Sequence, residues 1–289
     1  MGSNFYKHAY LIMVHKNTYV LDKMLELIDD KRNDIYIHID KKSKDFNKEN
    51  ILNVVKKSKL YFLESENVNW AAYSMVNVEI RLMEKANKNQ RYMYYHLLSG
   101  NDMPLVSQDV IHNEMAKDSG IEYVSIGGNT DTWSKYYYFL TETSLYRTNK
   151  IIKGISRIAL VLPQKLFKVD RWKNTGYVSK WAYQWFSLTN ECVEYILQNE
   201  KFIIKHFKNT HSPDETFLAT MLYNSNEFNE KVRPSKRNIQ FKDGKPTVLK
   251  LKDFDRLIQS GDFFARKFDE NIDKEIIDKI YNYVKGSRE

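Results

Sequence analysis

One acidic residue of the sequence combines a reactive side chain with a defined local position. The segment HSPDETFLATML places Ser212, Pro213 and Glu215 in front of an apolar run. Ser212 could cap a helix, Pro213 suits the first helical position, and Glu215 would complete a capping box. A carboxylate there could also be a catalytic base, and its spacing from Leu218 and Leu222 predicts that Glu215 shares the apolar face of the helix.

The C-terminal third carries positive charge that could bind an anion. Between residues 231 and 252 the single acidic residue is Asp243, and the basic residues are Lys231, Arg233, Lys236, Arg237, Lys242, Lys245, Lys250 and Lys252. Such a run is most often a solvated face, and the sharper interpretation is a site for a phosphate-containing ligand. The formal charge of the whole chain, +8, fits both interpretations.

Common cofactor and metal motifs are missing from the sequence. It has no Gly-x-Gly-x-x-Gly, no Walker A motif, no Gly-x-Ser-x-Gly elbow and no Cys/His cluster with zinc spacing. The single Asp-x-Asp motif, formed by Asp253 and Asp255, opens a predicted helix, where the helix dipole already explains acidic residues. We therefore favour a structural role for this motif over metal binding.

The histidines and the single cysteine are expected to be structural. His38 alternates with isoleucines in a predicted strand and His96 lies among aromatic residues, which is typical of buried, hydrogen-bonded histidines. Cys192 lies in a predicted helix and is expected to be a buried, inert thiol. One cysteine allows no internal disulfide, which suits a reducing compartment.

The N-terminal part of the chain predicts an open α/β sheet. Apolar runs predict strands, and helical spacing predicts intervening helices; the strands are 8–16, 34–40, 59–64 and 92–99, and the helices are 18–30, 48–57 and 72–86. This order favours right-handed crossovers and a ligand beyond the carboxyl ends of the strands. The residues at those ends are Val14, His15, Asp40, Asn101 and Asp102. We expect a nucleotide-like ligand there.

The remainder mixes strands and helices, and we expect it to join the first part in a single domain. Strands are predicted at 121–126, 135–140 and 184–189, and helices near 191–197, 213–223, 252–259 and 274–284. With 42% hydrophobic residues and no repeat, we expect one domain over 4–289, with a nucleotide-binding half (about 4–105) and an acceptor and catalytic half (about 106–289). Residues 1–3 resemble a cloning remnant.

One segment, 150–168, is both basic and apolar. Lys153, Arg157, Pro163 and Lys165 interrupt it, so it cannot span a bilayer. Two interpretations remain for this segment. It could contact an anionic membrane surface, or it could be a plain core helix, which is the commoner case.

Seven segments, taken in order, resemble one family of enzymes. They are AYLIMVHKN, IYIHIDKKS, VNWAAYSMVNVEI, YHLLSGNDMPL, SKWAYQWFSLT, SPDETFLATML and FFARKFDENID, and they run from about residue 8 to 275. This ordered set is similar to the core-2/I-branching β-1,6-N-acetylglucosaminyltransferases, with their xylosyltransferase relatives and bacterial homologues.

The resemblance implies a GT-A-like nucleotide-sugar fold, with a mostly parallel, Rossmann-like sheet flanked by helices. It also implies an inverting glycosyltransferase that works without a divalent metal or other cofactor. By this comparison Glu215 is the general base, Lys267 binds the donor diphosphate, and Lys245 stands in for a family arginine, while Arg266 could assist. Inverting transfer needs a base for the acceptor hydroxyl and positive charge for the leaving diphosphate, which lysines can supply.

The same comparison assigns further residues to the two substrates. His15, Asp40 and Trp70 fall at nucleotide-binding positions, Asp102 stands at the donor site in the GNDMP turn, and Phe241 falls where the family holds the acceptor sugar. Trp70 and Phe241 could instead be core aromatics. Asp40 could merely cap the following turn.

Three aromatic residues alternate in a predicted strand of the second half. Trp181, Tyr183 and Trp185 could line an acceptor groove or simply pack, and we favour packing for Trp185.

The resemblance also predicts the setting and the substrates. Animal relatives are disulfide-rich and anchored in membranes, features that this sequence lacks, so we expect a bacterial, cytoplasmic enzyme of surface polysaccharide or glycolipid synthesis. The expected partners are a UDP-sugar, most simply UDP-N-acetylglucosamine, and a glycan or lipid-linked oligosaccharide at the inner face of the cell membrane. A non-catalytic carbohydrate-binding protein is the alternative. No recognised motif supports a nucleic-acid-binding protein.

Overall fold

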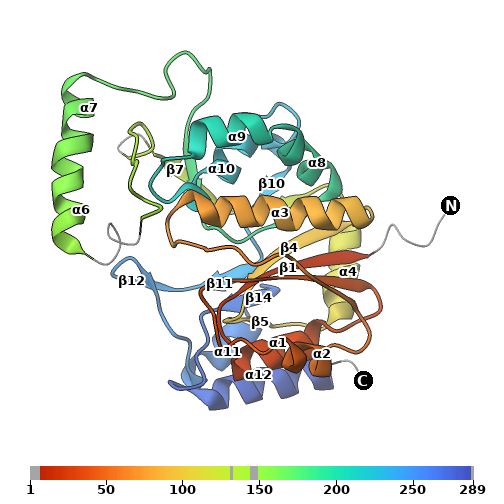
Figure 1. Ribbon diagram of the computed structural model, residues 1–289. Coiled ribbons are helices and arrows are strands. Elements are labelled where there is room, and N and C mark those ends of the chain that lie inside the picture. Colours follow the sequence, from red (N-terminus) through yellow and green to blue (C-terminus); the bar gives the residue numbers. More distant parts are fainter. Residues whose placement is uncertain (1–6, 131–132, 144–148, 288–289) are drawn as a thin grey trace.

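A seven-stranded sheet forms from the predicted apolar runs (Figure 1). The computed structural model describes residues 7–130, 133–143 and 149–287, so the remnant suggested at residues 1–3 lies outside the described part. The strands, in the spatial order β10-β6-β9-β4-β1-β2-β3, are β10 (Val232–Arg233), β6 (Glu122–Tyr123), β9 (Ser187–Thr189), β4 (Tyr94–Ser99), β1 (His8–Val14), β2 (Asn33–Ile39) and β3 (Lys59–Phe62).

The first four strands along the chain, β1 to β4, are parallel to one another. They alternate with helices α1 (Tyr19–Ile28), α2 (Lys48–Val54) and α3 (Tyr73–Asn89). Because α3 covers one face and α1 and α2 cover the other (Figure 1), all of β2 is buried, which explains its nearly continuous apolar sequence. The order β3-β2-β1-β4 reverses direction at β1, and such a switch point leaves a crevice at the carboxyl ends of β1 and β4.

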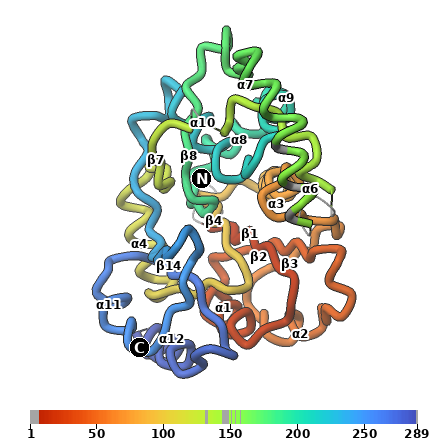
Figure 2. Tube along the Cα trace, turned by 90° about the vertical axis from the view of Figure 1, so that its left-hand side faces the viewer, coloured from red at the N-terminus to blue at the C-terminus, as the bar shows by residue number. Residues whose placement is uncertain are grey.

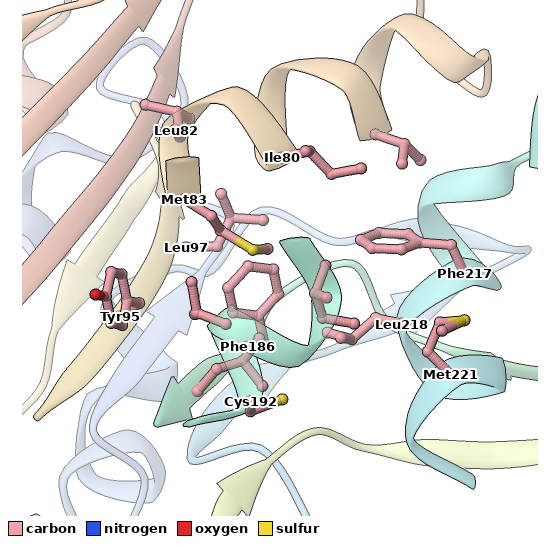
Figure 3. Close-up of a cluster of buried hydrophobic side chains, with 14 of the residues drawn as sticks. Ile80, Leu82, Met83, Tyr95, Leu97, Phe186, Cys192, Phe217, Leu218 and Met221 are labelled. Atoms are coloured by element: carbon pink, nitrogen blue, oxygen red, sulfur yellow. The ribbon is translucent and has the colours of Figure 1, made fainter. Parts of the chain in front are cut away.

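The second half of the chain completes the same sheet. β9 is antiparallel to both β4 and β6. Helices α8 (Asn190–Gln198), α9 (Glu200–Phe207) and α10 (Phe217–Tyr223) share the face of α3, and Figure 3 shows Met83, Phe186, Phe217, Leu218 and Met221 directed into one apolar cluster. Cys192 is fully buried in this cluster, as predicted.

Smaller sheets accompany the seven-stranded sheet. A three-stranded sheet has the order β11 (Arg237–Ile239), β14 (Phe264–Arg266) and β5 (Asp102–Pro104), and beneath it lie α11 (Phe254–Ile258) and α12 (Lys274–Gly286). Two antiparallel pairs of strands complete the fold. One joins β12 (Phe241–Lys242) to β13 (Lys245–Pro246), and the other joins β7 (Ile126–Asn129) to β8 (Lys180–Ala182).

The predicted class, an α/β domain with a mostly parallel sheet flanked by helices, is confirmed. The strand predicted at 135–140 is wrong, because this segment forms turns whose backbone bonds to Gln164 and Asn209 instead of a strand. Of the strand predicted at 184–189, only Ser187–Thr189 is formed. The sequence interpretation also left out α4 (Gln108–Lys117) and α9.

The segment 150–168 is helical, and the core-helix interpretation of it is wrong. It forms α6 (Lys150–Ser156), the π-helical turn η1 (Arg157–Val161) and α7 (Leu162–Leu166), and these stand at the edge of the molecule (Figure 1). Most of its described apolar side chains are exposed. Within the described residues, no helix is long and apolar enough to cross a membrane.

Candidate active site

A cleft of about 850 Å³ opens at the carboxyl ends of β1, β2 and β4. Figure 2 looks onto the side of the molecule at which these strands end. This volume suits a substrate the size of a nucleotide sugar. Of the residues predicted from sequence, those lining the cleft are Val14, His15, Asp40, Trp70, Asn101, Lys245, Arg266 and Lys267. Those predicted but lying outside its lining are Asp102, Trp181, Tyr183, Glu215 and Phe241.

Arg266 is the most constrained cation of the cleft. Its guanidinium lies 3.8 Å from the centre of the Trp185 ring, and Nε lies 3.5 Å from Oδ1 of Asp102. Nε and Nη1 have no hydrogen-bond partner among the described residues. Burial lowers the pKa of Arg266, yet a guanidinium keeps its charge at neutral pH. Arg266 lines the cleft and carries a fixed positive charge that suits a diphosphate, so it is a more central candidate than the sequence indicated.

Asp102 contacts Arg266 from the buried side and does not line the cleft. It is 2% exposed, and its Oδ2 accepts a 2.6 Å hydrogen bond from the backbone of Ser99. In the β5–β14 pair Asp102 stands directly opposite Arg266. Burial raises the pKa of Asp102, and the charge of Arg266 opposes that effect. Asp102 thus lies outside the cleft lining, in contact with Arg266, and not at the place in the donor site that the sequence predicted.

Two lysines add positive charge from different elements. Lys267 follows β14, and its carbonyl accepts a hydrogen bond from the backbone of Leu249. Lys245 stands on β13, directly after a tight turn in which Asp243 and Gly244 have positive φ angles of 52° and 71°. The second of these positions suits glycine, because a side chain there would be strained. Both lysines reach the same cleft, as predicted.

His15 and Asp40 mark the ends of the first two strands. The pKa of His15 is lowered by burial and by Lys16 and Lys267, while Asp40 opposes the shift, so the imidazole is neutral at pH 7. Asp40 Oδ1 accepts a 3.0 Å hydrogen bond from the backbone of Lys42. Asp40 therefore caps the following turn and also lines the cleft, while its binding of a nucleotide stays a prediction.

The exposed aromatic residues are not core residues. Trp70 is 70% exposed at the cleft, and Phe241 is 43% exposed. Phe241 stacks on Tyr183 with ring centres 4.8 Å apart, and Trp181 meets Tyr183 edge-on at 5.4 Å. The three residues predicted to bind the acceptor thus form one aromatic cluster. It is adjacent in sequence to Trp185, which packs on Arg266 and also lines the cleft.

The SPDE segment differs from its prediction in local structure. Ser212 has a left-handed conformation (φ 48°), and its side chain caps no helix, so the capping box is wrong. Pro213–Glu215 forms a 3₁₀ turn (η2), and α10 begins only at Phe217. The break at Thr216 turns Glu215 to solvent while Leu218 is buried, so the prediction that Glu215 shares the apolar face is also wrong.

The SPDE segment is nevertheless joined to one wall of the cleft. The backbone N–H of Ser212 donates a 3.1 Å hydrogen bond to the carbonyl of Ala71, the residue after Trp70. Protein around the carboxylate raises the pKa of Glu215 by desolvation, although the side chain remains open to solvent on one side. A carboxylate at the mouth of a recess has both properties. Such a group is well suited to take a proton from a bound hydroxyl.

Two buried carboxyl groups, those of Asp214 and Glu79, interact near Glu215. Asp214 is 7% exposed, and burial together with the charge of Glu215 raises its pKa to about 7. Glu79 of α3 is fully buried, its pKa is raised well above the usual value by burial and by Asp214, and it accepts a 2.7 Å hydrogen bond from Gln184. Gln184 lines the cleft. The sequence carried a signal for Glu79, since it lies four residues after Met75 on the apolar face of α3.

The remaining candidates have structural roles. Asp253 accepts a 2.9 Å hydrogen bond from the backbone of Lys250 and pairs with Arg256, so it serves the start of a helix. Among the described residues, no group of His, Cys, Asp or Glu is arranged to hold a metal ion. His96 bonds to Ser187 and His8, as expected of a structural histidine. His38 accepts from the backbone of Glu66 and has a pKa lowered to about 4 by burial.

The sequence of residues 8–254 matches the family described as "Core-2/I-Branching enzyme". The chain belongs to this family of glycosyltransferases. Xylosyltransferase 2 of Rattus norvegicus is 22% identical over 96% of the chain and 34% of its own length. The β-1,3-galactosyl-O-glycosyl-glycoprotein β-1,6-N-acetylglucosaminyltransferase of Homo sapiens is 26% identical over 74% of the chain and 47% of its own length.

A solved structure, apo mouse xyloside xylosyltransferase 1, covers 89% of the chain and 96% of its own, with a TM-score of 0.38 and 11% identity. The chain thus spans between a third and a half of the two curated relatives named above. Family membership confirms the resemblance expected from the seven sequence segments.

Proposed function

We propose that this chain is an inverting, metal-independent glycosyltransferase that moves a sugar from a UDP-sugar to a hydroxyl group of a glycan or glycolipid. The proposal rests chiefly on one arrangement, in which Arg266, Lys267 and Lys245 line a cleft at the switch point of the sheet. The SPDE segment, which carries Glu215, is hydrogen-bonded to Ala71, next to Trp70 in the wall of that cleft. The cations supply fixed positive charge for a diphosphate leaving group, the role that a metal ion plays in other enzymes.

The proposed reaction is a single displacement. Glu215 takes the proton of the acceptor hydroxyl, and the oxygen attacks C1 of the donor sugar. The bond between C1 and the diphosphate oxygen breaks on the opposite face, so the configuration at C1 inverts. The electron pair of that bond leaves with UDP, whose growing negative charge Arg266 and the two lysines stabilise. A positioned base contributes about 10²–10⁴-fold to such a step.

The finer assignments are also proposals. The name of the human relative supports N-acetylglucosamine as the transferred sugar. The buried lone thiol of Cys192 suits a reducing, cytoplasmic setting. We propose a bacterial role in the synthesis of a surface polysaccharide or glycolipid.

The decisive test measures UDP release from UDP-N-acetylglucosamine with a panel of acceptors, with and without EDTA. We expect turnover that EDTA leaves unchanged and that Glu215→Gln reduces by about 10²-fold or more while UDP binding persists. An Asp255→Asn variant, altered at an exposed carboxylate, is the control and should keep full activity. Sugar binding without UDP release from any pair would favour the non-catalytic alternative, and rescue of EDTA-treated enzyme by Mn²⁺ would overturn metal independence.

A further inference from the structure

An apolar stripe faces solvent along the helical segment formed by α6, η1 and α7, which we call the outer helix (residues 150–166). Surface helices normally turn such a stripe toward the core. Here the stripe members and the following Phe167 are between 48% and 81% exposed; they are Ile151, Ile155, Ile158, Leu162, Leu166 and Phe167. The first five recur at intervals of four, three, four and four residues, so they share one face. An exposed apolar stripe of this length indicates an interaction surface.

The opposite side of the outer helix holds it to the body of the protein. Val161 is buried, and the Gln164 side chain donates to the carbonyl of Tyr137 at 2.9 Å and accepts from its backbone N–H at 2.8 Å. The stripe is thus exposed because the helix is anchored by its other face. The exposure of the stripe therefore follows from the way in which the outer helix packs on the protein.

The charged residues in the sequence around the stripe indicate which kind of surface would bind it. From residue 143 to 169 the sequence has no acidic residue and six basic ones, Arg147, Lys150, Lys153, Arg157, Lys165 and Lys168. Lys165 and Lys168, at the end of the outer helix, are exposed. A second copy of the stripe would bring the same positive charge against it, on a chain that already carries +8. An apolar face flanked by cations suits an anionic lipid surface.

The outer helix is also connected to the cleft. The segment that Gln164 holds continues to Glu142, whose carboxylate accepts 2.8 Å and 2.9 Å hydrogen bonds from the backbone and the hydroxyl of Ser74. The carbonyl of Glu142 accepts a 2.9 Å bond from Asn69, the residue before Trp70. Figure 1 shows the outer helix on the same side of the molecule as β12, whose hairpin carries one wall of the cleft.

We propose that the outer helix binds the surface of an anionic lipid bilayer, with the stripe in the interface. This binding does not depend on the activity proposed above. The consequence for the acceptor does rest on the proposed function: a membrane-bound enzyme would present its cleft to lipid-linked acceptors. No described helix is suited to cross a bilayer, so the stripe would lie along the surface.

Sedimentation of the full chain with vesicles tests the proposal. We expect binding to vesicles of phosphatidylcholine with a quarter phosphatidylglycerol, weakening with added salt, and at least about tenfold weaker binding to phosphatidylcholine alone. The double variant Ile158→Glu, Leu166→Glu should lose about tenfold or more of the anionic-vesicle affinity. The matched control, Leu52→Glu with Ile272→Glu, changes two other exposed apolar residues (53% and 51% exposed) on other parts of the surface and should bind as the wild type does.

The remaining outcomes either support or overturn the proposal. Absence of binding to anionic vesicles at low salt, or equal binding by the stripe variant and the wild type, would overturn it. Dimers that the stripe variant dissociates would assign the stripe to a second copy instead. UDP affinity and transfer to a water-soluble acceptor should stay unchanged in the stripe variant, so a failure of the lipid proposal is distinguishable from a failure of the proposed function.

Discussion

Arg266 lies opposite Asp102 in the antiparallel pair of β14 and β5, with Nε of the arginine 3.5 Å from Oδ1 of the aspartate. The carboxylate holds the guanidinium from the buried side, and Trp185 covers it with its ring 3.8 Å away. Arg266 lines the cleft, so its positive charge is held in place beside the position that we propose for a diphosphate. A preorganised cation of this kind stabilises developing charge without rearranging during the reaction.

Replacing Arg266 should reduce the rate of sugar transfer more than it reduces the stability of the fold. We expect Arg266→Gln to lower kcat/KM for the UDP-sugar by about 10²-fold or more, the typical loss for one stabilising donor. Steady-state kinetics and UDP titration measure the effect. Arg256→Gln is the matched control, since that arginine is exposed on α11 outside the cleft lining, and equal losses in the two variants would contradict the assignment.

Asp102→Asn should act through stability and through the position of Arg266. The variant keeps the shape of the side chain but leaves a buried guanidinium without its charged partner. We expect the free energy of unfolding to fall by about 1–3 kcal/mol in urea denaturation. Asp255→Asn, at an exposed site, should change it by less than about 0.5 kcal/mol. If Asp102→Asn were as stable as the wild type, the pair of Asp102 and Arg266 would contribute nothing to the stability of the fold.

The sequence predicted the N-terminal sheet well because its physical signal is local. Strands covered on both faces read as continuous apolar runs, and β1, β2 and β4 all appear where such runs predict them. The strand expected at 135–140 failed because its tyrosines match a strand pattern, while its backbone bonds to Gln164 and to Asn209. Those partners are distant in sequence, so no local pattern could reveal them.

The sequence predicted the cleft residues at strand ends well, and it predicted the other residues of the site less well. Val14, His15 and Asp40 reach the cleft because parallel strands end at one edge of the sheet. The roles of Arg266 and Asp102 depend on a β5–β14 pairing between segments far apart in the chain. Likewise, the break at Thr216 that turns Glu215 away from the apolar face follows from the left-handed Ser212, which the SPDE motif alone does not predict.

The pH profile should report the ionisation of the proposed base. Since desolvation raises the pKa of Glu215 above the ordinary 4.5, kcat/KM should rise with pH through an apparent pKa higher than that value. Glu215→Asp should keep this acidic limb at a reduced rate, while the residual activity of Glu215→Gln should lack it. An unchanged limb in the Gln variant would assign the ionisation to another group.

The raised pKa of Asp214 should also make stability depend on pH. The folded state holds a proton on this carboxyl up to about pH 7, whereas the ordinary pKa is 3.8. The folded state therefore binds more protons in that interval, and the free energy of unfolding should fall as pH rises through it. At about 1.4 kcal/mol per pH unit, the contribution reaches at most about 4 kcal/mol.

Asp214→Asn isolates this contribution. Glu79 and Glu215 interact with the same carboxyl and titrate in both proteins, so the difference between the two curves reports the ionisation of Asp214 together with its effect on these two neighbours. Urea unfolding between about pH 4 and pH 8 should show a weaker decline in the variant. Parallel curves for the variant and the wild type would contradict the raised pKa.

The aromatic cluster should serve the acceptor and leave the donor unaffected. Phe241 stacks on Tyr183 at 4.8 Å and keeps 43% of its surface exposed, so its free face can pack on a sugar ring. Loss of an aromatic contact worth about 0.5–1.5 kcal/mol should raise the acceptor KM of Phe241→Ala by about 2–12-fold, with UDP affinity unchanged. Tyr283→Ala, equally exposed on α12, is the control. A rise in donor KM without a change for the acceptor would place Phe241 in the donor site instead.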